Sequence, residues 1–190
     1  MREIRTKVTD ANDGMHRARE FQKAKQMLEK CRYINARLYH LTFIGSEQVK
    51  PYQDAMKALC ERLRRNHMPC QWKACIEAEE DKGLHWHVYI LVEAKHRNPD
   101  HIINRKSTEW LTQMVTKLGL DFYLNPPQNR LHWDSAGEPK NYATLPKRKP
   151  EKLDDCIEWI SYLYKARSKF IHKPIYFSSR PTKEKLPVII

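Results

Sequence analysis

The chain has 190 residues, of which 41% are hydrophobic and 31% charged, a composition that fits one folded domain and excludes a disordered protein. Lysine and arginine number 35 against 23 acidic residues, so the formal net charge is +12 and we expect a polyanionic partner such as nucleic acid. The first ten residues lack an apolar run, and no stretch approaches the roughly 18 apolar residues of a membrane span, which predicts a cytoplasmic protein without membrane binding.

The N-terminal third predicts helix, strand and helix in that order. Residues 15–33 contain few helix breakers and predict a basic helix. Residues 37–44 are rich in β-forming side chains and end at Gly45, which predicts a strand. Pro51 favours the start of a helix that continues to about residue 66. We expect a basic helical extension at 1–35, the main domain at 36–180 and a flexible tail at 181–190.

The middle of the chain predicts a hairpin and then a helix. Residues 72–80 and 84–93 are two β-like runs, and the loop 81–83 between them contains a glycine. Residues 107–118 have helical apolar spacing, and Gly119 predicts the end of this helix. A short strand at 131–133 is an additional expectation.

The C-terminal part predicts a long helix and a short strand. Pro150 favours a helix start, and the sequence to residue 169 carries acidic side chains early and basic ones late, as the helix dipole prefers. Residues 174–179 come next and predict a last strand.

His85 and His87 are a candidate metal site. On a strand they share one face because side chains alternate, and Trp86 points to the other face, where a core position is favoured over stacking on a base. Two imidazoles on one face can hold a divalent ion: Mn²⁺ or Mg²⁺ for phosphate chemistry, with Zn²⁺, Ni²⁺ or Co²⁺ also compatible. The alternative is that both histidines are ordinary polar positions on an edge strand.

A carboxylate from the preceding strand is the expected third ligand. With the loop at 81–83, Glu79 would pair with His85 and Glu77 with His87, so both glutamates would face the histidines. A two-residue turn at 82–83 would instead bring Ala78 and Glu80 to that face. The choice of carboxylate therefore depends on the loop, whereas the histidine pair does not.

The predicted helix at 150–169 contains two candidate nucleophiles. Tyr162 lies off the apolar stripe, in a row with Trp159 and Lys165, and the Lys165 ammonium can favour the phenolate or stabilise charge on a phosphate. The alternative is that Tyr162 is an exposed aromatic side chain on a basic helix, which an isolated Tyr-x-x-Lys spacing favours. If the stripe packs directly on the histidine face, Tyr164 would point toward the metal, so Tyr164 remains the second candidate. The stripe comprises Leu153, Cys156, Ile157, Ile160, Leu163 and Tyr164.

His-Trp-His at 85–87, with Tyr-Leu-Tyr-Lys later at 162–165, resembles the Rep class of HUH endonucleases, whose signature is His-hydrophobic-His and a later tyrosine helix. Glu77, the apolar run after His87, and ISYLYKARSK with a short strand after it look like the gene-II-type replication proteins of filamentous phages and prophages. The resemblance covers roughly residues 37–180.

The resemblance implies an α+β fold with a central antiparallel sheet of about five strands flanked by helices. It implies that His85, His87 and Glu77 bind Mn²⁺ or Mg²⁺, with Glu79 as the alternative carboxylate. Tyr162 would be the nucleophile, assisted by Lys165. We expect one catalytic tyrosine, because Glu158 and Ala166 rather than tyrosines occupy the flanking helical turns.

The implied activity is nicking and joining of single-stranded DNA at a replication origin in a bacterial host cell. A 5′-phosphotyrosine forms, and the free 3′-OH starts rolling-circle replication. The sequence lacks GxxxxGK[ST], so a host helicase and replication machinery are the expected partners of a monomer or weak dimer. The alternatives are a non-catalytic nucleic-acid-binding domain and an HUH transposase or relaxase. Candidate phosphate contacts are Lys95, Arg97, Arg105, Lys147, Arg148, Lys149, Arg167 and Lys169.

Overall fold

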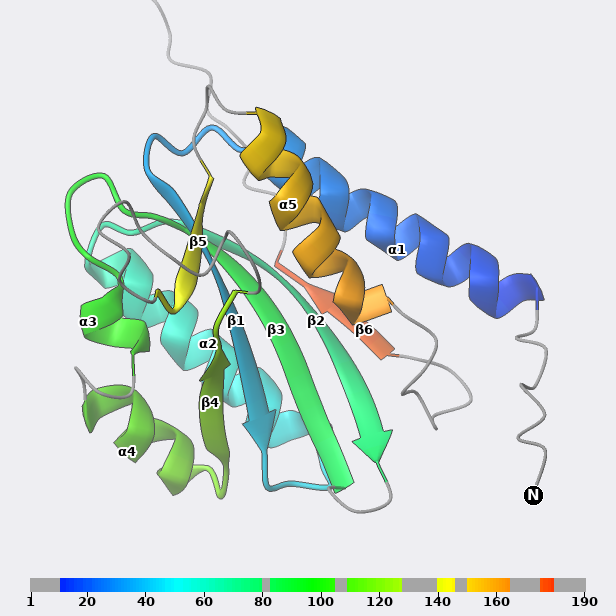
Figure 1. Cartoon of the computed structure of the whole chain (residues 1–190). Coiled ribbons are helices and arrows are strands. Elements are labelled where there is room, and N and C mark those ends of the chain that lie inside the picture. Colours follow the sequence, from blue (N-terminus) through cyan, green and yellow to red (C-terminus); the bar gives the residue numbers. More distant parts are fainter. Residues whose placement is uncertain are drawn as a thin grey trace, which may run out of the picture.

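The computed structural model describes residues 11–79, 83–104, 109–127, 140–145, 150–164 and 175–179. In these residues one antiparallel sheet of six strands has helices on both faces, which confirms the predicted α+β class (Figure 1). The strands are β1 (Ala36–Ile44), β2 (Cys70–Glu79), β3 (Gly83–Glu93), β4 (Asp121–Asn125), β5 (Tyr142–Leu145) and β6 (Ile175–Ser178). The helices are α1 (Ala11–Glu29), α2 (Val49–Arg65), α3 (Asp100–Ile103), α4 (Glu109–Lys117) and α5 (Pro150–Ser161), and α5 continues into the 3-10 turn η2 (Tyr162–Tyr164).

The sheet has the strand order β4-β1-β3-β2-β6, and β5 also pairs with β1. β4 pairs with residues 40–44 of β1 and β5 with residues 36–39, so these two short strands lie end to end along one side of β1. The sheet is therefore five strands wide, with β3 at its centre.

Strand alternation gives the sheet two apolar faces, each with its own core. On β3, Trp86, Val88 and Ile90 belong to the core beneath α2, α3 and α4. Tyr89 and Leu91 belong to the core beneath α1 and α5 on the opposite face. Figure 1 shows α1 and α5 in front of the sheet and α2 behind it. We call the side that carries His85, His87 and Tyr89 the histidine face.

Trp86 has the core position that the sequence favoured. Its side chain is fully buried, and its ring stacks on that of Tyr52 with 5.4 Å between the centroids. The ring of Phe177, from β6, also contacts the indole, at a centroid distance of 4.7 Å. A buried ring in this position is not available for stacking on a base.

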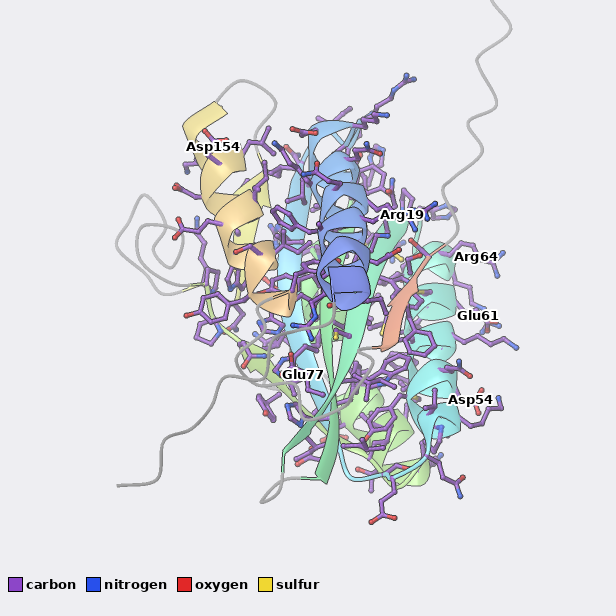
Figure 2. The ribbon with its side chains drawn as sticks, turned by 90° about the vertical axis from the view of Figure 1, so that its right-hand side faces the viewer. Arg19, Asp54, Glu61, Arg64, Glu77 and Asp154 are labelled. Carbon is purple, nitrogen blue, oxygen red and sulfur yellow. The ribbon has the colours of Figure 1, made fainter. Side chains whose placement is uncertain are left out.

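Helix α2 is amphipathic, with one buried side and one exposed side. Its buried side chains recur at helical spacing and turn toward the sheet, whereas Asp54, Glu61 and Arg64 extend from its outer side (Figure 2). The buried set comprises Tyr52, Ala55, Met56, Leu59 and Leu63.

Helix α1 is part of the second core. Ala24 and Leu28 are buried there with residues of β1, β3 and α5, and Phe21 packs against the same group. The predicted basic helix at 15–33 thus corresponds to α1, which contributes apolar surface to the histidine face. Among the described helices, none is both long and apolar enough to cross a membrane.

The predicted strands and helices differ from the structure in a few places. Strands β4 and β5 and the short helix α3 were not predicted. Gly119 ends α4 as expected, with a positive φ of 71°. The predicted C-terminal helix changes to the 3-10 turn at Tyr162, and residues 165–169 lie outside the described part of the chain. The strand expected at 131–133 and the tail at 181–190 lie outside it as well.

Candidate active site

Strands β2 and β3 form the expected hairpin, but with a different register. Glu77 pairs with His85, Cys75 with His87 and Glu79 with Gly83, so the loop comprises residues 80–82 rather than 81–83. The prediction that Glu77 lies opposite His87 was therefore wrong by two residues. Because side chains alternate with a period of two, a shift of two leaves Glu77 on the histidine face.

Glu77, His85 and His87 converge on the histidine face. One carboxylate oxygen, Oε2 of Glu77, lies 3.6 Å from Nε2 of His85 and 3.4 Å from Nε2 of His87. One ligand atom from each residue lies within 4.8 Å of the other two. Atoms that each bind an ion at ~2.1 Å can be at most ~4.2 Å apart, and both glutamate–histidine distances satisfy this limit.

The donor set and its burial suit a divalent cation. Glu77 and His85 are 5% and 3% exposed, while the His87 side chain is 22% exposed and so retains access to solvent. A buried carboxylate is costly unless its charge is neutralised by a proton or balanced by a bound cation. Two nitrogen ligands and one oxygen ligand fit Mn²⁺, Co²⁺ or Zn²⁺, and a carboxylate also suits Mg²⁺.

Polar residues behind His87 form a second layer on β1 and β4. Nδ1 of His87 lies 3.0 Å from Oγ1 of Thr42 and 3.1 Å from Nε2 of His40. Asn125 donates a hydrogen bond from Nδ2 to Oγ1 of Thr42 at 2.7 Å. Burial, and then the nearby His87, lower the pKa of His40 well below its usual value, so its ring is neutral.

Tyr89 links the histidines to helix α5. It lies two residues beyond His87 on the same face, its ring stacks on His40 at 4.2 Å, and its hydroxyl donates to the carbonyl of Trp159 at 2.8 Å. The Trp159 ring also contacts His40, at a centroid distance of 6.0 Å. These contacts fix the C-terminal end of α5 above the histidine face.

The helical pattern placed Trp159 in a row with Tyr162 and Lys165, next to the apolar stripe, and its side chain is buried. It is 6% exposed and belongs to the second core, together with most of the apolar stripe. The apolar stripe of α5 therefore packs on the histidine face, and Trp159 packs there beside it.

Tyr162 and Tyr164 differ sharply in their surroundings. Tyr164 packs into the core, stacked on Tyr176 at 5.2 Å and against Phe21 at 5.6 Å, and burial raises its pKa far above the usual value. Tyr162 is 51% exposed. The pKa of Tyr89 is raised first by burial and then by electrostatic interaction with Tyr162, Glu77 and Tyr164. Of the two tyrosines, Tyr162 is the accessible one.

Of the predicted DNA contacts, the described part of the chain contains Lys95 and Arg97, which follow the end of β3 that is remote from His85. Lys95 and Arg97 are exposed and follow Glu93, the last residue of β3, which lies about 20 Å along the strand from His87 at ~3.3 Å per residue. Arg97 donates a hydrogen bond to Oδ1 of Asn66. Lys165, the Glu79 side chain and the remaining basic candidates lie outside the described part of the chain: Arg105, Lys147, Arg148, Lys149, Arg167 and Lys169.

The sequence prediction missed His40, Thr42 and Asn125. His40 and Thr42 alternate with Leu41 and Phe43 in the second half of β1, which is otherwise apolar, and this pattern is a signal for polar groups on the histidine face. Asn125 could not be found in this way because β4 itself was not predicted.

A comparison of the chain with protein-family models, curated proteins and solved structures found no significant match. The function must therefore be inferred from the geometry of the site and from the residue pattern.

Proposed function

We propose that this protein is a metal-dependent endonuclease of the HUH Rep class, which nicks and joins single-stranded DNA through a covalent link to Tyr162. The observation that carries the proposal is the convergence of Glu77, His85 and His87 beneath the end of α5, where Trp159 anchors the turn that begins with Tyr162. The net charge of +12 supports a nucleic-acid substrate.

Each residue has a defined task in this proposal. Glu77, His85 and His87 hold a divalent cation, which when bound supplies positive charge to a scissile phosphate. The Tyr162 oxygen forms a bond to phosphorus as the bond from phosphorus to the 3′ oxygen breaks. The products are a 5′-phosphotyrosine and a free 3′-OH, and the proton lost by the Tyr162 hydroxyl is balanced by the proton gained by the 3′ oxygen. Attack by a 3′-OH on the same link rejoins the strands.

Exposure supports Tyr162 over Tyr164 as the nucleophile. A nucleophile must meet a phosphate of the substrate, and the Tyr164 ring lies between Phe21 and Tyr176 in the core. The raised pKa of Tyr164 also disfavours its phenolate. Using Tyr164 would require removing its ring from this packing.

The test mixes the purified protein with single-stranded oligonucleotides that carry origin-like sequences, together with Mn²⁺, and looks for a protein–DNA adduct on denaturing gels. We expect an adduct with the wild type and with Tyr164→Phe, and none with Tyr162→Phe. Peptide mapping of the adduct should identify Tyr162. Adduct loss only in Tyr164→Phe would exchange the two roles.

Two other functions are outcomes of the same experiment. A non-catalytic nucleic-acid-binding domain would shift the oligonucleotides on native gels but would give no adduct under any condition. A transposase or relaxase would form an adduct only with hairpin ends or with transfer-origin sequences. An origin-like library that gives adducts at one sequence supports a replication initiator at a host origin.

A further inference from the structure

The His87 ring has different partners on its two nitrogens. Nε2 faces Glu77, whose Oε2 atom is 3.4 Å away. Nδ1 faces the interior of the sheet, where Oγ1 of Thr42 and Nε2 of His40 lie at 3.0 Å and 3.1 Å. A neutral imidazole has one N–H and one lone pair, and only the nitrogen with the lone pair can bind a cation. The location of the proton therefore decides whether His87 is ready to act as a ligand.

Thr42 is held rigidly opposite His87. The two residues are directly paired in the β1–β3 ladder, and the Thr42 side chain is fully buried. On the other side of β1, the Asn125 amide donates to Oγ1 of Thr42 at 2.7 Å. One lone pair of the hydroxyl oxygen is thus used by Asn125, and the other is available to an N–H from His87.

We propose that Thr42 and Asn125 are positioning residues that keep the His87 proton on Nδ1 and so leave the Nε2 lone pair for a divalent cation. His40 offers a second acceptor to the same proton through its Nε2. The chain of contacts runs across three strands, from Asn125 on β4 through Thr42 on β1 to His87 on β3. This inference rests on the proposed metal site and identifies the groups behind the ligand that prepare it.

The β-branched side chain of threonine suits the task of positioning His87. Branching at Cβ restricts the χ1 rotation of Thr42, so its hydroxyl is held in its direction at little entropic cost. Valine would fill the same volume without the acceptor, and serine would keep the acceptor. The pair Thr42→Val and Thr42→Ser therefore separates the hydrogen bond from packing.

The direct test reads the tautomer in metal-free protein by ¹⁵N NMR of histidine-labelled samples, with His87 assigned by its loss in His87→Gln. We expect the wild type and Thr42→Ser to carry the proton on Nδ1, and Thr42→Val to show increased protonation at Nε2. Wild-type protein with the proton on Nε2 would overturn the inference. This readout needs neither metal nor DNA cleavage.

The second test measures Mn²⁺ affinity by calorimetry. Loss of an outer-shell partner typically weakens metal binding ~10–100-fold, and we expect this range for Thr42→Val, a smaller loss for Asn125→Ala and little change for Thr42→Ser. Equal affinity in the wild type and Thr42→Val would contradict the inference. If the wild type bound no Mn²⁺ while His87 still carried its proton on Nδ1, the proposed metal site would fail and the positioning of the ring would stand.

Discussion

The Oε2 atom of Glu77 lies 3.4 Å from Nε2 of His87, although Cys75 is the residue that pairs with His87 across the β2–β3 ladder. Glu77 pairs with His85, so one carboxylate reaches its direct partner and a diagonal neighbour. A single oxygen placed between two imidazoles is well suited to complete a three-residue cation site.

Removal of that carboxylate gives the first prediction. We expect Glu77→Gln to lower Mn²⁺ affinity by at least ~100-fold, beyond the ~10–100-fold loss typical of outer-shell partners, because a charged ligand is lost. Isothermal titration calorimetry measures the change. The matched control is Glu61→Gln on the outer side of α2, which should bind Mn²⁺ as the wild type does. Equal affinities in the two variants would rule out Glu77 as a ligand.

Tyr162 and Tyr164 should differ in their contribution to stability. We expect Tyr164→Ala to lower the free energy of unfolding by ~2–4 kcal/mol, because it removes a ring packed between Phe21 and Tyr176. Tyr162→Ala, at a half-exposed position, should change it by less than ~1 kcal/mol. Urea unfolding monitored by circular dichroism measures both values, and a larger loss for Tyr162→Ala would contradict the packing described for η2.

Lys73 provides a prediction about a buried charge. Its side chain is 8% exposed on the histidine face of β2, and burial lowers its pKa, with Glu20 of α1 acting in the opposite direction. Replacement by methionine keeps the apolar stem and removes the buried ammonium. We therefore expect Lys73→Met to raise the free energy of unfolding by about 1 kcal/mol at pH 7.

The advantage of Lys73→Met should also depend on pH. Between the lowered pKa of the folded state and the ordinary value of 10.5, the unfolded chain holds more of this proton than the folded protein does. The free energy of unfolding of the wild type therefore rises with pH across that window as far as Lys73 determines it. The difference in free energy of unfolding between the wild type and Lys73→Met becomes smaller as a result. Urea unfolding at pH 7 and pH 10 gives the comparison. A gap that widens with pH would contradict a lowered pKa for Lys73.

Gly45 and Gly119 allow the same substitution at two left-handed positions. A Cβ added to Gly45, with φ of 111°, would lie 2.9 Å from the backbone oxygen of Gly119, whereas a Cβ added to Gly119, with φ of 71°, would meet nothing within 4 Å. We expect Gly119→Ala to cost about 1 kcal/mol through its backbone conformation alone, and Gly45→Ala to cost ~2–4 kcal/mol. Thermal unfolding ranks the two variants, and equal losses would show that the close approach does not matter.

The histidine face could be predicted because it depends only on alternation. His85 and His87 must share a side of any strand, and a three-residue loop at either 80–82 or 81–83 leaves Glu77 on that side. The partner of each histidine could not be predicted, since both loops have the same length and similar polar sequences. The short strands β4 and β5 were missed because each has only five or four residues, and with β4 the contribution of Asn125 was missed.

The helical period placed Tyr164 in the apolar stripe and Tyr162 off it, and the structure agrees, because Tyr164 packs against the second core and Tyr162 is 51% exposed. The partners of Tyr164 could not be predicted, because Phe21 and Tyr176 come from α1 and β6, far away in the sequence. The change to a 3-10 turn at Tyr162 was not predicted either. Successive residues of such a turn are separated by about 120°, against about 100° in an α-helix.

The two strands that flank α5 in the chain lie on opposite sides of the sheet (Figure 1). Strand β5 precedes α5 and pairs with β1, whereas β6 follows α5 and pairs with β2. The β2–β6 pairing joins Cys75 to Tyr176, residues separated by 101 positions in the chain, and such distant contacts close slowly during folding. The hairpin that carries the histidines, by contrast, is local. During synthesis the growing chain can thus bring Glu77, His85 and His87 together well before the pairing of β6 completes the sheet.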